Sequence, residues 1–94
     1  MKVVLFGAAG FLGREVRGQL VAAGHAVVGV DRAPAEGLLV ADITQPQSLD
    51  GLSFDCDVVV NLAARVPTTP STLTEHREMF EVNTIGALRV IETF

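Results

Sequence analysis

Three glycines, Gly7, Gly10 and Gly13, follow a run of apolar residues at positions 3–6. The apolar run contains two valines and is typical of a strand that is buried on both faces. The residues after the glycines recur at helical spacing and predict a helix whose core-facing side holds Leu12, Val16, Leu20 and Ala23. Glycine is costly inside regular structure and is useful where the backbone turns sharply or approaches a ligand closely. The sequence therefore predicts a tight turn from a strand into a helix.

Three further apolar segments are predicted to be strands. They cover residues 25–31, 37–42 and 58–62. The second strand of the chain ends at Asp31 and the third ends at Asp42. Residues 32–36 are too few for a crossover helix, so we expect a loop there. Pro67 and Pro70 mark another loop after the fourth strand.

Two capping boxes mark the starts of further helices. Thr44 with Gln47 predicts a short helix that runs through Leu49. Thr72 with Glu75 predicts a long helix that runs to the end of the chain. The predicted apolar stripe of this long helix consists of Leu73, Phe80, Ile85, Leu88 and Ile91.

The alternation of strands and helices predicts the fold class. Buried strands that alternate with helices imply an α/β fold, in which a parallel sheet is covered by helices on both faces. Right-handed crossovers then give a Rossmann-like sheet with strand order 3-2-1-4. The pattern is truncated after the fourth strand and its following helix.

The charge and the cysteine content limit the function classes. The net charge is −4 and no basic cluster is present, which argues against nucleic-acid binding. Lys2 precedes an apolar run that is too short for a signal peptide or a membrane span. The single cysteine, Cys56, excludes an intrachain disulfide and suits a reducing compartment. We therefore expect a cytoplasmic protein with neither nucleic acid nor membrane among its partners.

An acidic residue at the end of the second strand suggests a ligand for the glycine turn. In dinucleotide-binding folds, glycines after the first strand let backbone N–H groups approach a pyrophosphate, and a carboxylate after the second strand binds ribose hydroxyls. Asp31 lies 18 positions after Gly13. The glycine spacing is GxxGxxG, one residue longer than the GxGxxG fingerprint, so a tight turn that binds no ligand is the alternative. The two features together favour a dinucleotide site.

Five motifs occur in order along residues 3–92: GAAGFLG, VDR, ADI, VVNLAARV and FEVNTIGALRVIE. Together they resemble the extended short-chain dehydrogenase/reductase family, and within it the NAD-dependent sugar-nucleotide epimerases and dehydratases. The resemblance implies that residues 1–94 are the N-terminal part of a dinucleotide-binding Rossmann domain. It implies NAD as the cofactor, with NADP as the alternative.

The resemblance also implies which residues contact each part of the cofactor. The pyrophosphate would lie against Gly7, Gly10, Phe11, Leu12 and Gly13. The adenosine half would contact Asp31, Arg32, Asp42 and Ile43. Of these, Asp31 would bind the ribose, and Asp42 would bind the adenine amino group. The nicotinamide half would contact Leu62, Ala63 and Ala64. Asn83 would tie the last helix to the fourth strand.

Some of these positions also have a simpler structural explanation. Asp42 fits a residue that begins a turn before Thr44, and the two alanines fit small residues under a packed helix. Asn83 is expected to point inward, because it shares a predicted helical face with Phe80 and Val90. A buried amide without a partner costs about 1–3 kcal/mol, so we expect Asn83 to bond to the backbone of the fourth strand. Such a bond fits a purely structural bridge as well as a part in the chemistry.

The catalytic tyrosine of this family, and the lysine four residues after it, have no counterpart here. The chain contains no tyrosine, and its only lysine is Lys2, at the start of the first strand. No other catalytic set and no metal-ligand pattern replaces them, so the expected function is the NAD-binding part of a longer epimerase or dehydratase. Its expected substrate is a small molecule such as a nucleotide sugar, and the full-length protein is expected to form a homo-oligomer. Two alternatives stay open: an NADP-dependent reductase of the same fold and a non-catalytic nucleotide-sensing module.

Overall fold

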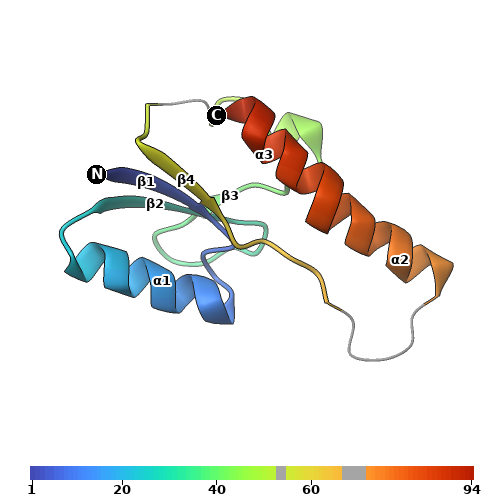
Figure 1. Cartoon of the computed structure of the whole chain (residues 1–94), viewed down its shortest axis with the longest axis horizontal. Coiled ribbons are helices and arrows are strands. Elements are labelled where there is room, and N and C mark those ends of the chain that lie inside the picture. Colours follow the sequence, from blue (N-terminus) through green and yellow to red (C-terminus); the bar gives the residue numbers. More distant parts are fainter. Residues whose placement is uncertain (53–54, 67–71) are drawn as a thin grey trace.

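A parallel sheet of four strands forms the centre of the molecule (Figure 1). The structure is a computed structural model that describes residues 1–52, 55–66 and 72–94. The strands are β1 (Lys2–Phe6), β2 (Ala26–Asp31), β3 (Leu39–Val40) and β4 (Val58–Asn61). They lie in the order β3-β2-β1-β4 with parallel pairing throughout, so the predicted Rossmann-like order is confirmed.

The predicted strands are all present, but each differs from its predicted bounds by one or more residues. β3 is two residues long, whereas the sequence predicts residues 37–42. β4 ends one residue before Leu62, although the Leu62 N–H still donates to the Phe6 carbonyl at 2.9 Å. The loop expected between β2 and β3 is present. The loop predicted at Pro67 and Pro70 lies outside the described residues.

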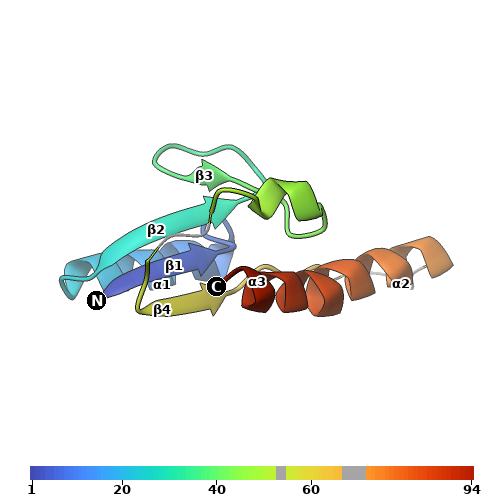
Figure 2. The same ribbon diagram turned by 90° about the horizontal axis from the view of Figure 1, so that it is seen from above.

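Helices cover both faces of the sheet, as predicted (Figure 1 and Figure 2). Side chains alternate between the two faces along a strand. Val4 and Phe6 of β1 point to the face that packs against the 3-10 helix η1 (Pro46–Leu49) and the helix α3 (Ala87–Thr93). Val3 and Leu5 point to the opposite face, which the helix α1 (Phe11–Ala22) covers. β1 is therefore buried on both faces, which explains its unbroken apolar run.

The side of α1 that faces the sheet differs from the predicted one. Gly13 is the only buried residue of α1, and Val16 and Leu20 are half-buried. Leu12 is 58% exposed and Ala23 is also exposed, so the prediction that both face the core is wrong. The cause is the contact of Gly13 with the backbone of the glycine turn, which rotates the helix so that Gly13 faces inward.

The last helix is continuous but contains a π-helical segment, η2 (Glu81–Gly86), between α2 (Leu73–Phe80) and α3. It begins as predicted, because the Glu75 N–H donates to Oγ1 of Thr72 at 3.2 Å. α2 buries no residue and extends away from the sheet (Figure 2). Within the described ranges, no helix is both long and apolar enough to cross a membrane.

The apolar stripe predicted for this long helix is wrong. Of its five members, Ile85 is half-buried and the others are exposed: Leu73, Phe80, Leu88 and Ile91. The helix instead packs through Val82, Gly86 and Val90, which are four residues apart. A π-helical segment has a longer hydrogen-bond repeat than an α-helix. The period of 3.6 residues that predicts the stripe therefore fails across η2.

The predicted cap of the short helix is also wrong. η1 begins at Pro46, with Gln45 as its N-cap residue, and the Gln45 side chain makes no capping hydrogen bond. Proline suits the first helical position because it has no N–H to satisfy. Thr44 bonds to Asp42 instead of capping the helix.

The corrected helix face gives a first test of the fold. Val90 is 2% exposed and Leu88 is 52% exposed. In the 94-residue chain we expect Val90→Ala to lower the free energy of unfolding by about 1–3 kcal/mol, because it leaves a cavity in the core. Leu88→Ala should change it by no more than about 0.5 kcal/mol. Urea denaturation measures both, and a larger loss for Leu88→Ala would contradict this packing.

Candidate functional site

The glycine turn is fastened to the end of β2. The N–H groups of Gly7 and Ala8 both donate to the Val30 carbonyl, at 2.9 and 3.2 Å. The Ala9 N–H donates to Oδ2 of Asp31 at 2.9 Å. These three bonds fix the path of the backbone between β1 and α1, and they determine where α1 begins.

Close backbone contacts explain two of the three glycines. Gly7 has φ +79°, and a Cβ atom there would lie 2.7 Å from backbone atoms of Leu62 and Ala63. A Cβ atom on Gly13 would overlap the carbonyl oxygen of Gly7. Gly10 has more room, because a Cβ atom there would lie 3.4 Å from the Gly7 carbonyl oxygen. The turn is therefore packed between α1 and the end of β4 with no space for side chains at Gly7 and Gly13.

The N-terminus of α1 is open. Gly10 is its N-cap residue, no side chain caps it, and its first turn contains no acidic residue. The N–H of Arg14 donates to the Gly10 carbonyl at 3.0 Å. The N–H groups of Phe11, Leu12 and Gly13 precede this bond and have no acceptor within the helix. Together with the helix dipole, they favour an anion at this end of α1.

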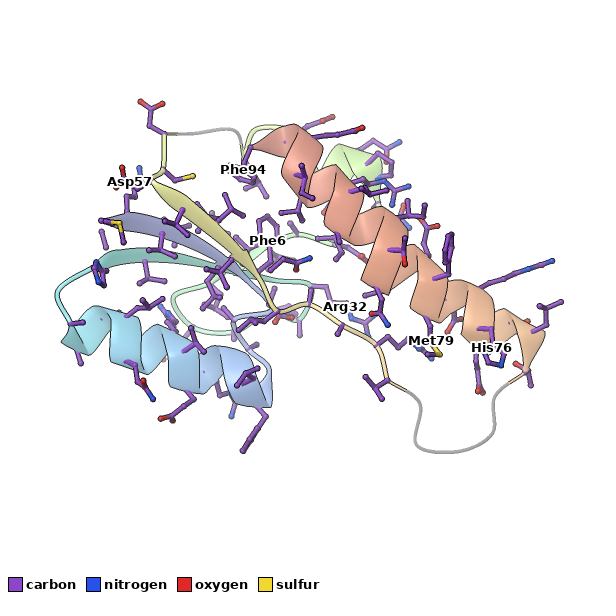
Figure 3. All side chains as sticks on the ribbon, viewed as in Figure 1. Phe6, Arg32, Asp57, His76, Met79 and Phe94 are labelled. Atoms are coloured by element: carbon purple, nitrogen blue, oxygen red, sulfur yellow. The ribbon has the colours of Figure 1, made fainter. Side chains whose placement is uncertain are left out.

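A cavity of about 340 Å³ opens at the carboxyl ends of β1, β2 and β4. The predicted site residues that line it are Gly7, Gly10, Asp31, Arg32, Asp42, Ile43, Leu62, Ala63 and Ala64. Figure 3 shows Arg32 at this end of the sheet and Asp57 at the other end. Three other predicted residues, Phe11, Leu12 and Gly13, lie at the adjoining start of α1, and Asn83 lies on η2.

The cavity walls also contain residues that the sequence does not predict. The lining residues that were not predicted as site residues are Phe6, Ala9, Val30, Ala33, Ala41, Arg65 and Val82. Their sequence signal is weak, since each is simply the direct neighbour of a predicted site residue in the sequence.

Asp31 holds the loops on either side of it. Its Oδ2 accepts the Ala9 N–H, and its Oδ1 accepts the Ala33 N–H at 3.1 Å. The residue is half-buried and lines the cavity. Each oxygen of a carboxylate can accept two hydrogen bonds, so Asp31 can also accept hydrogen bonds from a ligand hydroxyl.

Asp42 begins a turn and also lines the cavity. Its Oδ1 accepts hydrogen bonds from Thr44 N, at 2.9 Å, and from Thr44 Oγ1, at 2.7 Å, while its own N–H donates to Ser48 Oγ at 2.8 Å. Among the described residues, Oδ2 of Asp42 has no hydrogen-bond partner. Asp42 therefore begins a turn through one carboxylate oxygen and still lines the cavity, so the two interpretations of this residue are compatible.

The protonation state of Asp42 follows from these contacts. Partial burial by itself raises the pKa of Asp42, but the hydrogen bonds from Thr44 and the positive charge of Arg32 outweigh it. The pKa of Asp42 therefore lies below the ordinary value of an aspartate. At neutral pH its carboxylate is ionised and can only accept hydrogen bonds.

Asn83 ties the long helix to the segment after β4. Its Oδ1 accepts the Arg65 N–H at 2.8 Å, and its Nδ2 donates to the Arg65 carbonyl at 2.9 Å. The prediction that Asn83 points into the core is wrong, because Asn83 is exposed and lies on the π-helical segment. Its partner is also four residues beyond the last residue of β4, Asn61, rather than within the strand.

The arrangement suits an anionic ligand that also carries hydrogen-bond donors. The N-terminus of α1 offers backbone donors to an anion, whereas Asp31 and Asp42 offer acceptors at the other side of the same cavity. Ile43, Leu62 and the alanines after it provide apolar wall between them. In the part of the chain that the structure describes, no group of three or more His, Cys, Asp or Glu side chains could hold a metal ion.

The sequence matches one protein-family model along almost its whole length. The model of the NAD dependent epimerase/dehydratase family matches residues 3–94. A search of curated proteins found no match.

Several solved structures have the same fold, and each match includes nearly all of this chain but only part of the other protein. A short-chain dehydrogenase/reductase superfamily protein from Agrobacterium tumefaciens, solved with bound NAD, is 27% identical with a TM-score of 0.82. The match covers 99% of this chain and 28% of that protein. UDP-glucose 4-epimerase from Thermus thermophilus, in complex with NAD, is 25% identical with a TM-score of 0.83. The match covers 99% of this chain and 33% of the epimerase. Pal from Bacillus thuringiensis is 28% identical with a TM-score of 0.81, and the match covers 99% of this chain and 35% of Pal. The chain thus spans about a third of the length of these proteins.

Two glycines of α1 provide a matched pair of substitutions. We expect Gly13→Ala to destabilise the protein by at least about 1–3 kcal/mol, because its methyl group overlaps the Gly7 carbonyl oxygen. Gly18→Ala should stabilise it by about 0.5–1 kcal/mol, because a Cβ atom there meets nothing within 4 Å and alanine is the better helix former. Thermal or urea denaturation measures both. Equal effects of the two substitutions would refute the close contact at Gly13.

The hydrogen bond from the Thr44 hydroxyl to Asp42 can be tested by pH titration. Since the pKa of Asp42 is lowered in the folded state, its contribution to stability is present above the unfolded value of about 3.9 and is lost as the pH falls through the folded pKa. Thr44→Val removes the hydroxyl donor, so we expect the pKa of Asp42 to move upward, whereas Thr44→Ser should keep it low. Carboxyl ¹³C chemical shifts between pH 2 and 6 report this pKa. An unchanged midpoint in Thr44→Val would show that the hydroxyl does not stabilise the charge.

Proposed function

The chain belongs to the NAD-dependent epimerase/dehydratase family, and from this premise we propose that its 94 residues bind NAD as the N-terminal part of an NAD-dependent enzyme. The observation that carries the proposal is the shared cavity: the open N-terminus of α1 and the carboxylate of Asp31 face it together. In open parallel sheets, ligands bind outside the carboxyl ends of the strands, and this cavity lies at that edge.

The pyrophosphate of NAD fits the glycine turn. The turn leaves no space for a Cβ atom at Gly7 or Gly13, so backbone alone lines this part of the cavity. We propose that the pyrophosphate lies against Gly7 and Gly10 and accepts hydrogen bonds from the N–H groups of Phe11 and Leu12. Gly13 supports this contact indirectly, because it lets α1 start directly beside the turn.

The adenosine half fits the acidic side of the cavity. We propose that Asp31 accepts hydrogen bonds from the ribose hydroxyls and that Arg32 lies beside the adenine. Asp42, ionised and with Oδ2 unpartnered among the described residues, would accept a hydrogen bond from the adenine amino group. Ile43 would pack on the ring.

The nicotinamide half is assigned to the wall formed after β4. We propose that Leu62, Ala63 and Ala64 line it, and that Asn83 supports it by holding both backbone groups of Arg65. When bound, nicotinamide supplies the hydride chemistry, and a protein of this kind contributes position and proton transfer. The chain contains no tyrosine to move a proton, so we propose that the catalytic residues lie elsewhere in a longer protein.

The substrate, assembly and location of the full-length protein are also proposals. A small-molecule substrate such as a nucleotide sugar is supported by the likeness to UDP-glucose 4-epimerase from Thermus thermophilus. Homo-oligomer formation is supported by exposed apolar residues on the long helix, including Phe80 and Ile91. A cytoplasmic location is supported by the single free cysteine, Cys56.

One observation favours a second candidate, an NADP-dependent reductase of the same fold. Arg32 lines the same cavity as Asp31, and a guanidinium can pair with the 2′-phosphate of NADP. Asp31 opposes this, because a carboxylate about 4 Å from that phosphate repels it by roughly 1–4 kcal/mol. We therefore favour NAD.

Cofactor titration of the full-length protein separates these two candidates. We expect NAD to bind at least about tenfold more tightly than NADP, which corresponds to about 1.4 kcal/mol. Asp31→Asn should reduce this ratio, because it removes the charge that repels the phosphate. Glu36→Gln removes a carboxylate from an exposed position in the loop after β2 and should leave the ratio unchanged.

The same titration can reject the proposal. Tighter binding of NADP than NAD by the unmodified protein would favour the reductase. A ratio that stays the same in Asp31→Asn would remove Asp31 from the site. Failure to bind either cofactor would refute the proposed function.

A further inference from the structure

Arg89 of α3 joins the long helix to the loop after β3. Its Nη1 donates to the carbonyl oxygen of Ile43 at 3.0 Å and to Oε1 of Glu81 at 2.8 Å. The guanidinium carries two hydrogens on this nitrogen, so both bonds can form at once. The Arg89 side chain is only 24% exposed, and it bridges two segments that are 46 residues apart in the sequence.

Ile43 is held from two sides by the same long helix. Its side chain is 5% exposed and packs against Gly86, where a Cβ atom would lie 2.7 Å from Cγ1 and Cδ1 of Ile43. Its carbonyl oxygen accepts the hydrogen bond from Arg89. The helix therefore contacts both the side chain and the backbone of this one residue.

The peptide that Arg89 holds also carries the N–H group that bonds to Asp42. The Ile43 carbonyl belongs to the peptide that also carries the Thr44 N–H, and that N–H donates to Oδ1 of Asp42. The position of this peptide therefore sets the direction of the Asp42 carboxylate. Because Thr44 occupies Oδ1, the same constraint determines where Oδ2 points.

We propose that Arg89 is a positioning residue for Asp42 and thereby determines how strongly the site prefers adenine over a ring without an amino group. The inference rests on the proposed function, in which Asp42 binds the adenine amino group. Arg89 need not touch the ligand, since it acts through the Ile43 carbonyl. Glu81 assists by holding the guanidinium in the direction of this carbonyl.

The position of Glu81 and Asn83 on η2 supports a local role for Arg89. Asn83 holds Arg65, on the wall assigned to nicotinamide, whereas Glu81 holds Arg89 and through it the wall assigned to adenine. The two walls thus depend on different side chains of one helical segment. A defect at Arg89 should affect recognition of the base without a general loss of the cavity.

The test compares two cofactors that differ only at the base. Nicotinamide hypoxanthine dinucleotide has a carbonyl oxygen where NAD has the adenine amino group, so an ionised Asp42 can no longer accept a hydrogen bond from it. Isothermal titration of the full-length protein should show NAD binding about tenfold more tightly than this analogue. In Arg89→Met, which keeps much of the side-chain length but has no donor, the preference should fall below about threefold.

A matched arginine on the same helix serves as the control. Arg77 lies exposed on α2, away from the cavity, so Arg77→Met should keep the full preference. Both cofactors titrate the same folded molecules, so their affinity ratio does not change when a variant is merely less stable. If Arg89→Met fails to fold, Glu81→Gln replaces it. This variant keeps Arg89 but weakens its orientation, and it should lose part of the preference.

The outcomes separate this inference from the proposed function. An undiminished preference in Arg89→Met or, if that variant does not fold, in Glu81→Gln would overturn the role of Arg89 while leaving the NAD site intact. An equal loss in Arg77→Met would also overturn it. Tight NAD binding without any preference for adenine would remove Asp42 from the base contact, and the inference with it. Binding of neither cofactor would refute the proposed function itself.

Discussion

The contact between Gly13 and the Gly7 peptide is the constraint on which the site depends. It brings the first turn of α1 against the backbone at the end of β1, closer than any side chain at either position would allow. The Val30 carbonyl and the Asp31 carboxylate then hold the turn from the side of β2. These contacts place the uncapped N-terminus of α1 and the carboxylate of Asp31 at the same cavity. A nucleotide needs both, since it offers an anion and ribose hydroxyls to the same binding site.

Close contacts at the glycine turn explain why the site is made mostly of backbone on one side and of side chains on the other. Near the glycine turn, space is limited by the approach of Leu62 and Ala63. Farther along the edge of the sheet, the loops after β2 and β3 carry Asp31 and Asp42, whose carboxylates are positioned by neighbouring N–H groups. Hydrogen bonds to backbone therefore shape both halves of the cavity.

Much of the fold was predictable because its signals are local. The unbroken apolar run of β1 indicated a central strand, and the order of strands and helices indicated the arrangement β3-β2-β1-β4. The Thr72 cap was equally visible, because an N-cap residue and its partner lie three positions apart. Among the predicted site residues, most were found at the carboxyl edge of the sheet for the same reason: each lies at the end of a predicted strand or shortly after it.

The remaining features depend on contacts that no local pattern contains. The π-helical turn at Glu81–Gly86 changes which residues of the long helix face the sheet, so the predicted stripe and the inward direction of Asn83 both failed. Thr44 resembled a helix cap, a role in which its hydroxyl oxygen would accept a backbone N–H. In the structure its hydroxyl instead donates to the charged carboxylate of Asp42. The bridge from Arg89 to Ile43 joins residues far apart in sequence and had no signal at all.

A crystal structure of the full-length protein grown with NAD tests the central claim most directly. We expect the pyrophosphate to lie within hydrogen-bond distance of the backbone N–H groups at the start of α1, with the adenosine ribose on Asp31. Electron density for the dinucleotide in another place, for example in the cavity beside Cys56 and Phe94, would contradict the account. So would a cofactor bound at the carboxyl edge of the sheet with its pyrophosphate away from the glycine turn.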